Sequence, residues 1–138
     1  MTIRNSLVVL ALMVFGSSAI AHSHSEPGEQ ETGGLSMKTL ASGKLARVED
    51  TEYVVSRVVI PPDTKMPLHW HPGEEFAFVI RGEVTVLFQG QAPQVFREGE
   101  VGKVPLKQVH TAQTGELGAD LLVFRVHEQG EPERVLVE

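Results

Sequence analysis

The segment His69-Trp70-His71-Pro72-Gly73-Glu74-Glu75 holds the residue types best suited to chemistry in this sequence. Side chains at positions i and i+2 of a β-strand project from one face, so a strand here presents the imidazoles of His69 and His71 side by side. Glu75 opens the next expected strand, and His110 lies near the start of another. Imidazoles supply affinity for a first-row divalent cation, and a carboxylate offsets its charge. The pattern predicts a metal site of His69, His71, Glu75 and His110.

A single histidine in a strand is more often a half-buried polar residue than a metal ligand. Two adjacent imidazoles are harder to explain without a cation, because unpaired or like-charged groups held together cost free energy. Glu74 is the rival carboxylate, but strand alternation turns it to the opposite face, toward solvent. Glu75 shares its face with Ala77 and Val79, whose small side chains leave room for a cavity. Glu75 is also the candidate catalytic residue, because a carboxylate that leaves the metal can carry a proton.

From Leu35 onward, short β-rich runs alternate with turn signals, and no convincing apolar stripe of helical period is present. This spacing predicts an all-β fold, one sandwich or barrel domain of about ten short strands over residues 35–138. The expected strands are Met37–Ala41, Glu52–Ile60, Lys65–His71, Glu75–Ile80, Glu83–Phe88, Gln94–Arg97, Gly102–Val104, Val109–Gln113, Asp120–Val126 and Arg134–Val137.

The N-terminal segment has the features of an export signal. Arg4 precedes the apolar run Leu7–Phe15, and Ala19-Ile20-Ala21 follows as a cleavage site. As a helix the run would rise only about 14 Å, too short for a membrane anchor. Residues 1–21 are therefore expected to be a signal peptide cleaved after Ala21, which places the protein in the periplasm or outside the cell.

Residues 22–34 lack the apolar side chains needed for a core and are expected to form a flexible polar linker. His22 and His24 within it are the parts of an N-terminal copper chelate, although a plain polar tail is the favoured interpretation because nothing holds a third ligand in place.

Composition limits the partners of the chain. Its 138 residues include 12 Lys and Arg against 18 Asp and Glu, a formal charge of −6, which argues against nucleic acid and anionic membranes as partners. The absence of cysteine from the sequence excludes disulfides and a Cys-based zinc site.

These residues resemble the two signature motifs of the cupin family, whose members are small β-barrels of the jelly-roll type. The first motif, G-x5-H-x-H-x3,4-E-x6-G, is matched by His69, His71, Glu75 and Gly82. The second, G-x5-P-x-G-x2-H-x3-N, is matched by Gly99, Pro105 and His110. The resemblance implies a single jelly-roll barrel that holds one divalent metal ion inside it on His69, His71, Glu75 and His110.

Three positions depart from the family pattern: Asp63 and Lys107 stand where glycine is usual, and Thr114 stands where asparagine is usual. None of them is a ligand position. Because glycine is favoured where φ is positive, Lys107 is expected either to strain its turn by about 1 kcal/mol or to adopt a different loop.

The resemblance favours a small-molecule metalloenzyme, since single-domain cupins include quercetinase-like dioxygenases, isomerases and lyases. An oxygenase-like activity is the leading hypothesis. The alternatives are a non-catalytic periplasmic module that binds a small ligand, and a metal that only stabilises the barrel. An exported protein acquires its metal outside the cytoplasm, where the affinity of the site follows the Irving–Williams order. This order favours Zn or Cu, with Mn, Fe, Co and Ni as alternatives.

Two expected strands, Tyr53–Ile60 and Phe76–Ile80, are apolar on both faces. A sandwich strand normally exposes one face to water, so this pattern predicts a covered outer surface, most simply in a homodimer. Arg57 interrupts the first of these strands. It is expected either to reach into the cavity and bind a substrate carboxylate or to form a structural or interface pair.

Overall fold

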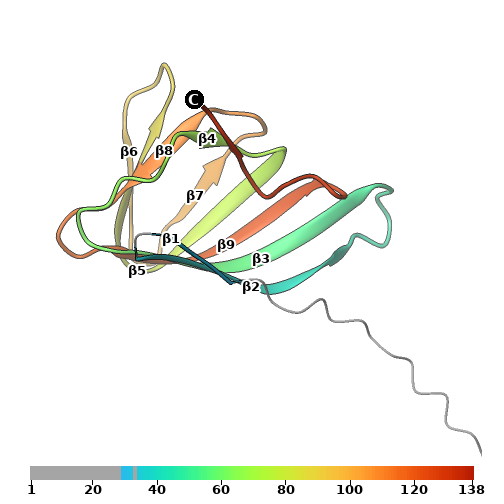
Figure 1. Ribbon diagram of the computed structural model, residues 1–138, viewed down its shortest axis with the longest axis horizontal. Helices are drawn as coiled ribbons and strands as arrows, with labels where there is room; N and C mark the ends of the chain where they lie inside the picture. Colours follow the sequence, from blue (N-terminus) through green and yellow to red (C-terminus); the bar gives the residue numbers. More distant parts are fainter. Residues whose placement is uncertain (1–28, 33) are drawn as a thin grey trace, which may run out of the picture.

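The computed structural model in Figure 1 describes residues 29–32 and 34–138, which form ten strands and no helix. The all-β expectation is confirmed. No helix in the described part of the chain is long and apolar enough to cross a membrane. The strands are β1 Glu29–Thr32, β2 Leu35–Lys44, β3 Thr51–Ile60, β4 His69–Trp70, β5 Gly73–Phe88, β6 Gln94–Arg97, β7 Val101–Val104, β8 His110–Gln113, β9 Ala119–Glu128 and β10 Val135–Leu136.

The strands form one curled antiparallel sheet whose two halves share β5. In one half the order is β1-β2-β3-β9-β5, with β7 on the other edge of β5. In the other half, β5 pairs with β8 and β6, and the order continues through β4 to β10. Figure 1 shows β4 and β8 above the long strands β9, β3 and β2. The residues that follow β9 return over these long strands toward β4.

Strand β5 corrects one sequence-based boundary. The sequence predicts two strands here, Glu75–Ile80 and Glu83–Phe88, separated by a turn at Arg81-Gly82. The expected turn is wrong, because β5 runs unbroken through 16 residues. A register shift between Val79 and Arg81 bends the strand there. Gly82 adopts φ 84°, and a Cβ at this position would collide with the Gly118 carbonyl. The glycine thus provides a bend that carries β5 from one half of the sheet to the other.

Two other segments differ from expectation. The strand expected over Lys65–His71 shrinks to His69–Trp70, because Pro67 has no N–H for a ladder, and Lys65 makes only an isolated bridge to Gln113. Part of the expected flexible linker is ordered, since Glu29–Thr32 pairs with β2 as β1. The expected signal peptide and the His22 and His24 tail lie outside the described residues.

The core lies between the two halves of the sheet. Alternation on β3 directs Val54, Ser56, Val58 and Ile60 inward, each at most 6% exposed. These positions follow the period of two that a half-buried strand requires. The main apolar cluster consists of Leu35, Met37, Val58, Ile60, Met66, Val79, Val84, Ala119, Leu121 and Val123.

The two positions where the cupin motif favours glycine have the backbone conformation that explains that preference. Asp63 adopts φ 50° and Lys107 adopts φ 57°, both in the left-handed region. Of the two outcomes expected for Lys107, the structure shows the strained turn. The Lys107 N–H donates to the His71 carbonyl at 3.0 Å, so this turn packs directly beside the histidine segment.

Candidate metal centre

Three histidines from separate parts of the chain meet inside the barrel. His69 lies on β4 opposite His110 on β8, and His71 follows β4 directly. One ring nitrogen from each lies within 4.8 Å of the others. All three are at most 3% exposed. The structure therefore places these three predicted ligands in a single buried group.

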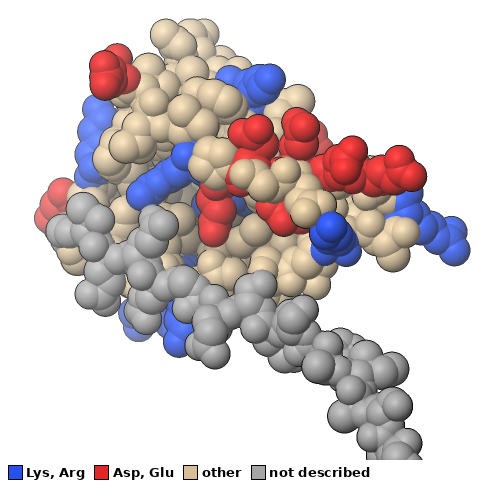
Figure 2. Space-filling view, turned by 45° about the vertical axis from the view of Figure 1, so that its right-hand side comes forward, with Lys and Arg blue, Asp and Glu red and all other residues tan. Residues whose placement is uncertain are grey.

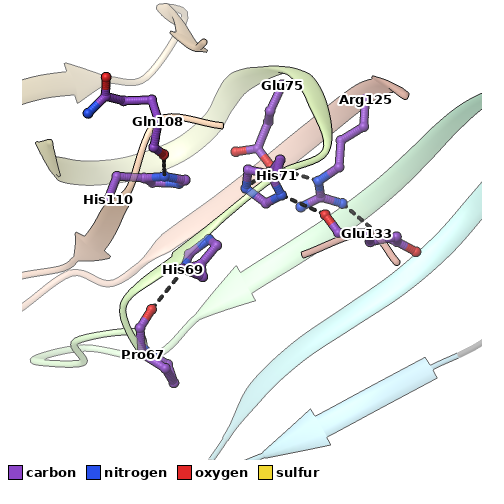
Figure 3. A network of polar contacts seen from close by, with 8 residues as sticks. All are labelled: Pro67, His69, His71, Glu75, Gln108, His110, Arg125 and Glu133. Atoms are coloured by element: carbon purple, nitrogen blue, oxygen red, sulfur yellow. Dashed lines mark hydrogen bonds and ion pairs between the residues drawn. The ribbon is translucent and has the colours of Figure 1, made fainter. Parts of the chain in front are cut away.

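Hydrogen bonds orient all three rings in the same way (Figure 3). Nδ1 of His69 donates to the Pro67 carbonyl at 2.7 Å, Nδ1 of His71 to the Glu133 carbonyl at 2.6 Å, and Nδ1 of His110 to the Gln108 carbonyl at 2.9 Å. A carbonyl oxygen can only accept, so the proton is on Nδ1 in each case. The three Nε2 atoms are left for another partner. This is the arrangement by which metal-binding histidines are fixed in tautomer and orientation.

Burial keeps two of these imidazoles neutral. Desolvation lowers the pKa of His69 to about 4, although the Pro67 carbonyl opposes the shift. Desolvation also lowers the pKa of His71, against the attraction of Glu75. A neutral imidazole has a lone pair available at Nε2, which is the form that binds metal.

Glu75 lies beside the histidines but is paired to an arginine. Its Oε2 is 2.7 Å from Nε of Arg125 and 3.1 Å from Nε2 of His71. It is not part of the group of three whose ligand atoms converge within 4.8 Å. Its role as a metal ligand stays a prediction.

The contact between His71 and Glu75 bears on whether a cation fits. Nε2 of His71 is buried and has no hydrogen-bond partner among the described residues. At 3.1 Å it faces a carboxylate oxygen, and a neutral imidazole with its proton on Nδ1 would set one lone pair against another. A cation between the two groups removes that repulsion. The buried imidazole nitrogens and this oxygen are therefore a donor set that fits a divalent transition metal.

Arg125 determines the charge of Glu75. Burial alone would raise the pKa of this carboxyl, but the Arg125 guanidinium, with His71 and His110, outweighs it and lowers the pKa. Because His71 is neutral, we attribute the effect chiefly to Arg125. Glu75 is thus a carboxylate at neutral pH.

Arg125 and Glu133 complete this network, and neither was predicted from the sequence. Arg125 on β9 lies opposite Glu75 on β5 in the sheet register, and its Nη1 binds Glu133 at 2.6 Å. Glu133 also accepts the His71 hydrogen bond through its carbonyl. One signal was present: Leu121, Val123 and Arg125 share a face of β9, so the arginine stands on an otherwise apolar, inward side.

A cavity of about 50 Å³ adjoins the centre. It is lined by His69, Glu75, His110 and Arg125, and otherwise mainly by apolar side chains. This volume holds a few water-sized groups. Only a small molecule, or the reactive end of one, fits there.

Arg57 does not reach this cavity. It projects from the outer face of β3 and binds Asp120 through two hydrogen bonds, of 3.0 and 2.7 Å. The expectation that it binds a substrate carboxylate in the cavity is therefore wrong, and the structural pair is confirmed. Glu74 also follows its expectation, since it is exposed and its Oε1 lies 2.6 Å from Nζ of Lys103.

Metal-free protein should lose stability as the pH falls from about 6.5 to about 4. Below pH 6.5 the unfolded chain protonates His69, whereas the folded protein does so only near its lowered pKa of about 4. The unfolded state therefore binds more protons in this window, and His69 alone accounts for up to about 3 kcal/mol. Urea unfolding at pH 7, 5.5 and 4 measures the loss, which His69→Gln should reduce. Equal pH slopes in the two proteins would contradict the prediction.

Sequence and structural comparisons place the fold. A sequence model of the Cupin domain matches residues 56–124, half of the chain, and that span contains the three histidines and Glu75. The chain belongs to the cupin family. An uncharacterized protein of Methanocaldococcus jannaschii is 26% identical to this cupin over 98 residues, which are 71% of this chain and 81% of that protein.

Solved structures with the same fold include two enzymes. The DMSP lyase DddQ from Ruegeria pomeroyi has a TM-score of 0.57 and 27% identity, and the match covers 64% of this cupin but only 44% of the lyase. Bacillus subtilis oxalate decarboxylase, described with Mn(II) centres, has a TM-score of 0.65 at 20% identity over 83% of this cupin and 31% of that chain. An RmlC-like cupin from Shewanella frigidimarina matches 80% of this chain and 95% of its own, with a TM-score of 0.60 and 18% identity. The last two likenesses show the shared fold.

Proposed function

We propose that this cupin is an exported metalloenzyme that acts on a small molecule at a centre of His69, His71 and His110, with Glu75 as fourth ligand and catalytic residue. The observation that carries the proposal is the common orientation of the three rings, whose Nδ1 atoms are all bound to backbone carbonyls. The adjoining cavity supports it, because a metal with only a structural role needs no space beside it. Zn or Cu is the metal favoured by export, with Mn, Fe, Co or Ni as alternatives.

A divalent metal bound here would supply Lewis-acid polarisation of a small oxygenated ligand, or a place to bring it together with O₂. The protein would supply orientation and proton transfer. Because Arg125 keeps Glu75 ionised, Glu75 can take a proton from a bound molecule but has none to give at neutral pH. The apolar cavity wall would limit the water that reaches the bound molecule.

Elemental analysis followed by a turnover screen tests the proposal. Protein purified from the periplasm should contain about one Zn or Cu per chain. Protein reloaded with Zn, Cu, Mn, Fe, Co or Ni should be screened for O₂ uptake and for isomerase or lyase products. The leading expectation is an oxygenase-like reaction that Glu75→Gln abolishes. One metal per chain with no turnover for any metal would favour the alternative, a non-catalytic module that binds a small ligand. Absence of metal binding would reject both.

Export itself is proposed from the sequence of residues 1–21. The mature protein recovered from the periplasm or medium should begin at His22, which intact mass measurement shows directly. Retention of the full 138-residue mass in the cytoplasm would contradict export.

We further propose that a second copy of this cupin covers the outer face of β3, β9 and β5. Phe78, Ile80, Leu122 and Phe124 are 37 to 42% exposed on this face. Light scattering with size-exclusion chromatography should show a dimer, and Leu122→Glu should give monomers. Leu117→Glu is the matched control, since Leu117 is 83% exposed in the turn before β9 and lies on none of these three strands. A monomeric wild type at micromolar concentration would contradict the proposal.

The acidic surface is relevant to the choice of partner. Figure 2 shows Asp and Glu side chains gathered in one region of the visible face, with Lys and Arg scattered around it. This distribution and the formal charge of −6 support a small molecule, rather than nucleic acid or an anionic membrane, as the ligand.

A further inference from the structure

The residues that follow β9, residues 129–138, return over the long strands and end beside β4 (Figure 1). We call this segment the C-terminal strap. Within it, β10 pairs with β4 and places Leu136 opposite His69. The Val137 N–H donates to the Leu68 carbonyl at 2.9 Å. The strap is therefore held directly against the strand that carries the first of the three histidines.

Glu133, within the strap, makes two contacts with the candidate metal centre (Figure 3). Its backbone carbonyl accepts the hydrogen bond from Nδ1 of His71 at 2.6 Å, and its carboxylate accepts one from Nη1 of Arg125 at 2.6 Å. Arg125 in turn binds Glu75 through Nε at 2.7 Å. One residue of the strap thus orients a predicted ligand through its backbone and, through its side chain, holds the arginine that binds Glu75.

The three imidazoles differ in what orients them. His69 and His110 donate to the carbonyls of Pro67 and Gln108, each of which precedes its histidine by two residues. Those carbonyls are in place whenever the short segment around each histidine is folded. The carbonyl that orients His71 belongs to the strap, so it is in place only when the strap is docked. Docking therefore decides the orientation of one ring of the three.

The strap is held by a short ladder. β10 contains two residues, whereas β3 and β9 pair along ten. A cavity of about 420 Å³ lies between the strap and the strands β2 and β3, so the strap is not packed against them along its whole length. Short terminal segments with few packed contacts open at lower free energy than a long ladder in the core. The strap is therefore the segment beside the centre that we expect to undock.

We propose that Glu133 is a positioning residue of the metal centre, and that the centre binds metal tightly only while the C-terminal strap is docked. The inference rests on the proposed function in one respect, that the histidines bind a divalent metal. When the strap is undocked, His69 and His110 stay oriented, while the His71 ring rotates and its proton exchanges between Nδ1 and Nε2. By linkage, a bound metal favours the docked strap by the same factor by which docking raises metal affinity.

Zinc titration of two Glu133 variants separates positioning from charge. Glu133→Ala removes the contact between the strap and Arg125, and it should weaken Zn²⁺ binding to the metal-free protein by about 10- to 100-fold, as is usual when a group that orients a ligand is lost. Glu133→Gln loses the same charge but keeps an oxygen that accepts from Arg125, so its Zn²⁺ affinity should stay within about threefold of the wild type. Equal losses in the two variants would overturn the positioning role, because charge alone would then explain them.

Val137→Pro loosens the strap without a change of charge. Proline has no N–H to donate to the Leu68 carbonyl, so Zn²⁺ affinity should fall about tenfold. Val137→Ala is the matched control, because it keeps the N–H and Val137 is 36% exposed. Its affinity should stay within about twofold of the wild type. Wild-type Zn²⁺ affinity in both Val137→Pro and Glu133→Ala would overturn the proposal.

Nitrogen NMR of the histidine rings in the metal-free protein distinguishes positioning from a general loss of structure. The wild type should show the Nδ1–H tautomer for all three rings. In Glu133→Ala and Val137→Pro, His71 should become a mixture of both tautomers, while His69 and His110 keep theirs. A change in all three rings, or in none, would overturn the role of Glu133.

Hydrogen exchange measures the coupling from the side of the strap. Saturating Zn²⁺ should slow exchange of the Val137 amide in the wild type by about tenfold or more. The Gln91 amide, which donates to the Phe88 carbonyl in the turn after β5, is the control and should not change. Equal exchange of the Val137 amide with and without Zn²⁺ would overturn the coupling. Failure of the proposed function would appear instead as no Zn²⁺ binding by the wild type, and the NMR measurement, which needs no metal, would still test the positioning of His71.

Discussion

His71→Ala should weaken binding of Zn²⁺ to the metal-free protein by more than about a hundredfold, because losing a ligand costs more than losing the hydrogen-bond partner of a ligand. His71 is suited to this test: it is 1% exposed, and its Nε2 has no hydrogen-bond partner among the described residues. At Zn²⁺ about a thousandfold above the wild-type Kd, wild-type protein should gain about 4 kcal/mol of stability, and the variant no more than about 1.4 kcal/mol. Calorimetry and thermal unfolding measure the two effects.

His127→Ala is the matched control for this prediction. His127 is a buried histidine, 4% exposed, that lies outside the group of three. Its removal should lower stability but leave Zn²⁺ affinity within about twofold. His110→Gln should repeat the His71→Ala result if the latter variant folds poorly. Stoichiometric binding by both ligand variants with wild-type affinity would reject the centre.

Arg125→Met should destabilise the metal-free protein by about 3 to 5 kcal/mol at pH 7, because it leaves two carboxylates without their cation. The Arg125 side chain is 5% exposed and lies 2.7 Å from Glu75 and 2.6 Å from Glu133. Adding Glu75→Gln to this variant should recover part of the loss, because the buried charge is then removed. Urea unfolding of the two variants and the wild type measures these differences in the free energy of unfolding.

Arg57→Met provides the comparison for the arginine prediction. Arg57 also binds a carboxylate on β9, but its side chain is 55% exposed, so water replaces the lost contact. Its removal should cost far less than removal of Arg125. Equal losses from the two substitutions would show that burial does not set the strength of the Arg125 pairs.

The fold and the histidine group were accessible from the sequence because both depend on local spacing. His69 and His71 are two residues apart, so any strand or extended segment brings their rings to one face. Their meeting with His110 and the barrel itself were implied by the cupin motifs. Glu74 was assigned to the outside by the same alternation. The prediction of a turn at Arg81-Gly82 was wrong, because a glycine with positive φ occurs both in turns and at bends within a continuous strand.

The charged network was harder to predict because its contacts depend on register. Glu75 and Arg125 are neighbours only because β5 pairs with β9 in one particular alignment. The sequence shows that Arg57 and Arg125 each stand on a strand with apolar neighbours, but the face that turns inward follows from the packing of the whole sheet. Glu133 lies in an irregular segment where periodicity gives no information.

The orientation of His71 depends on a carbonyl 62 residues further along the chain. While a polypeptide is still being made, β4 emerges from the ribosome well before Glu133, and during that interval nothing holds the His71 ring in its final tautomer. Metal capture by the proposed centre would therefore follow assembly of the barrel rather than nucleate it. An ion present during synthesis would have no preformed cage to enter, and the choice of metal would be made in the compartment where folding finishes.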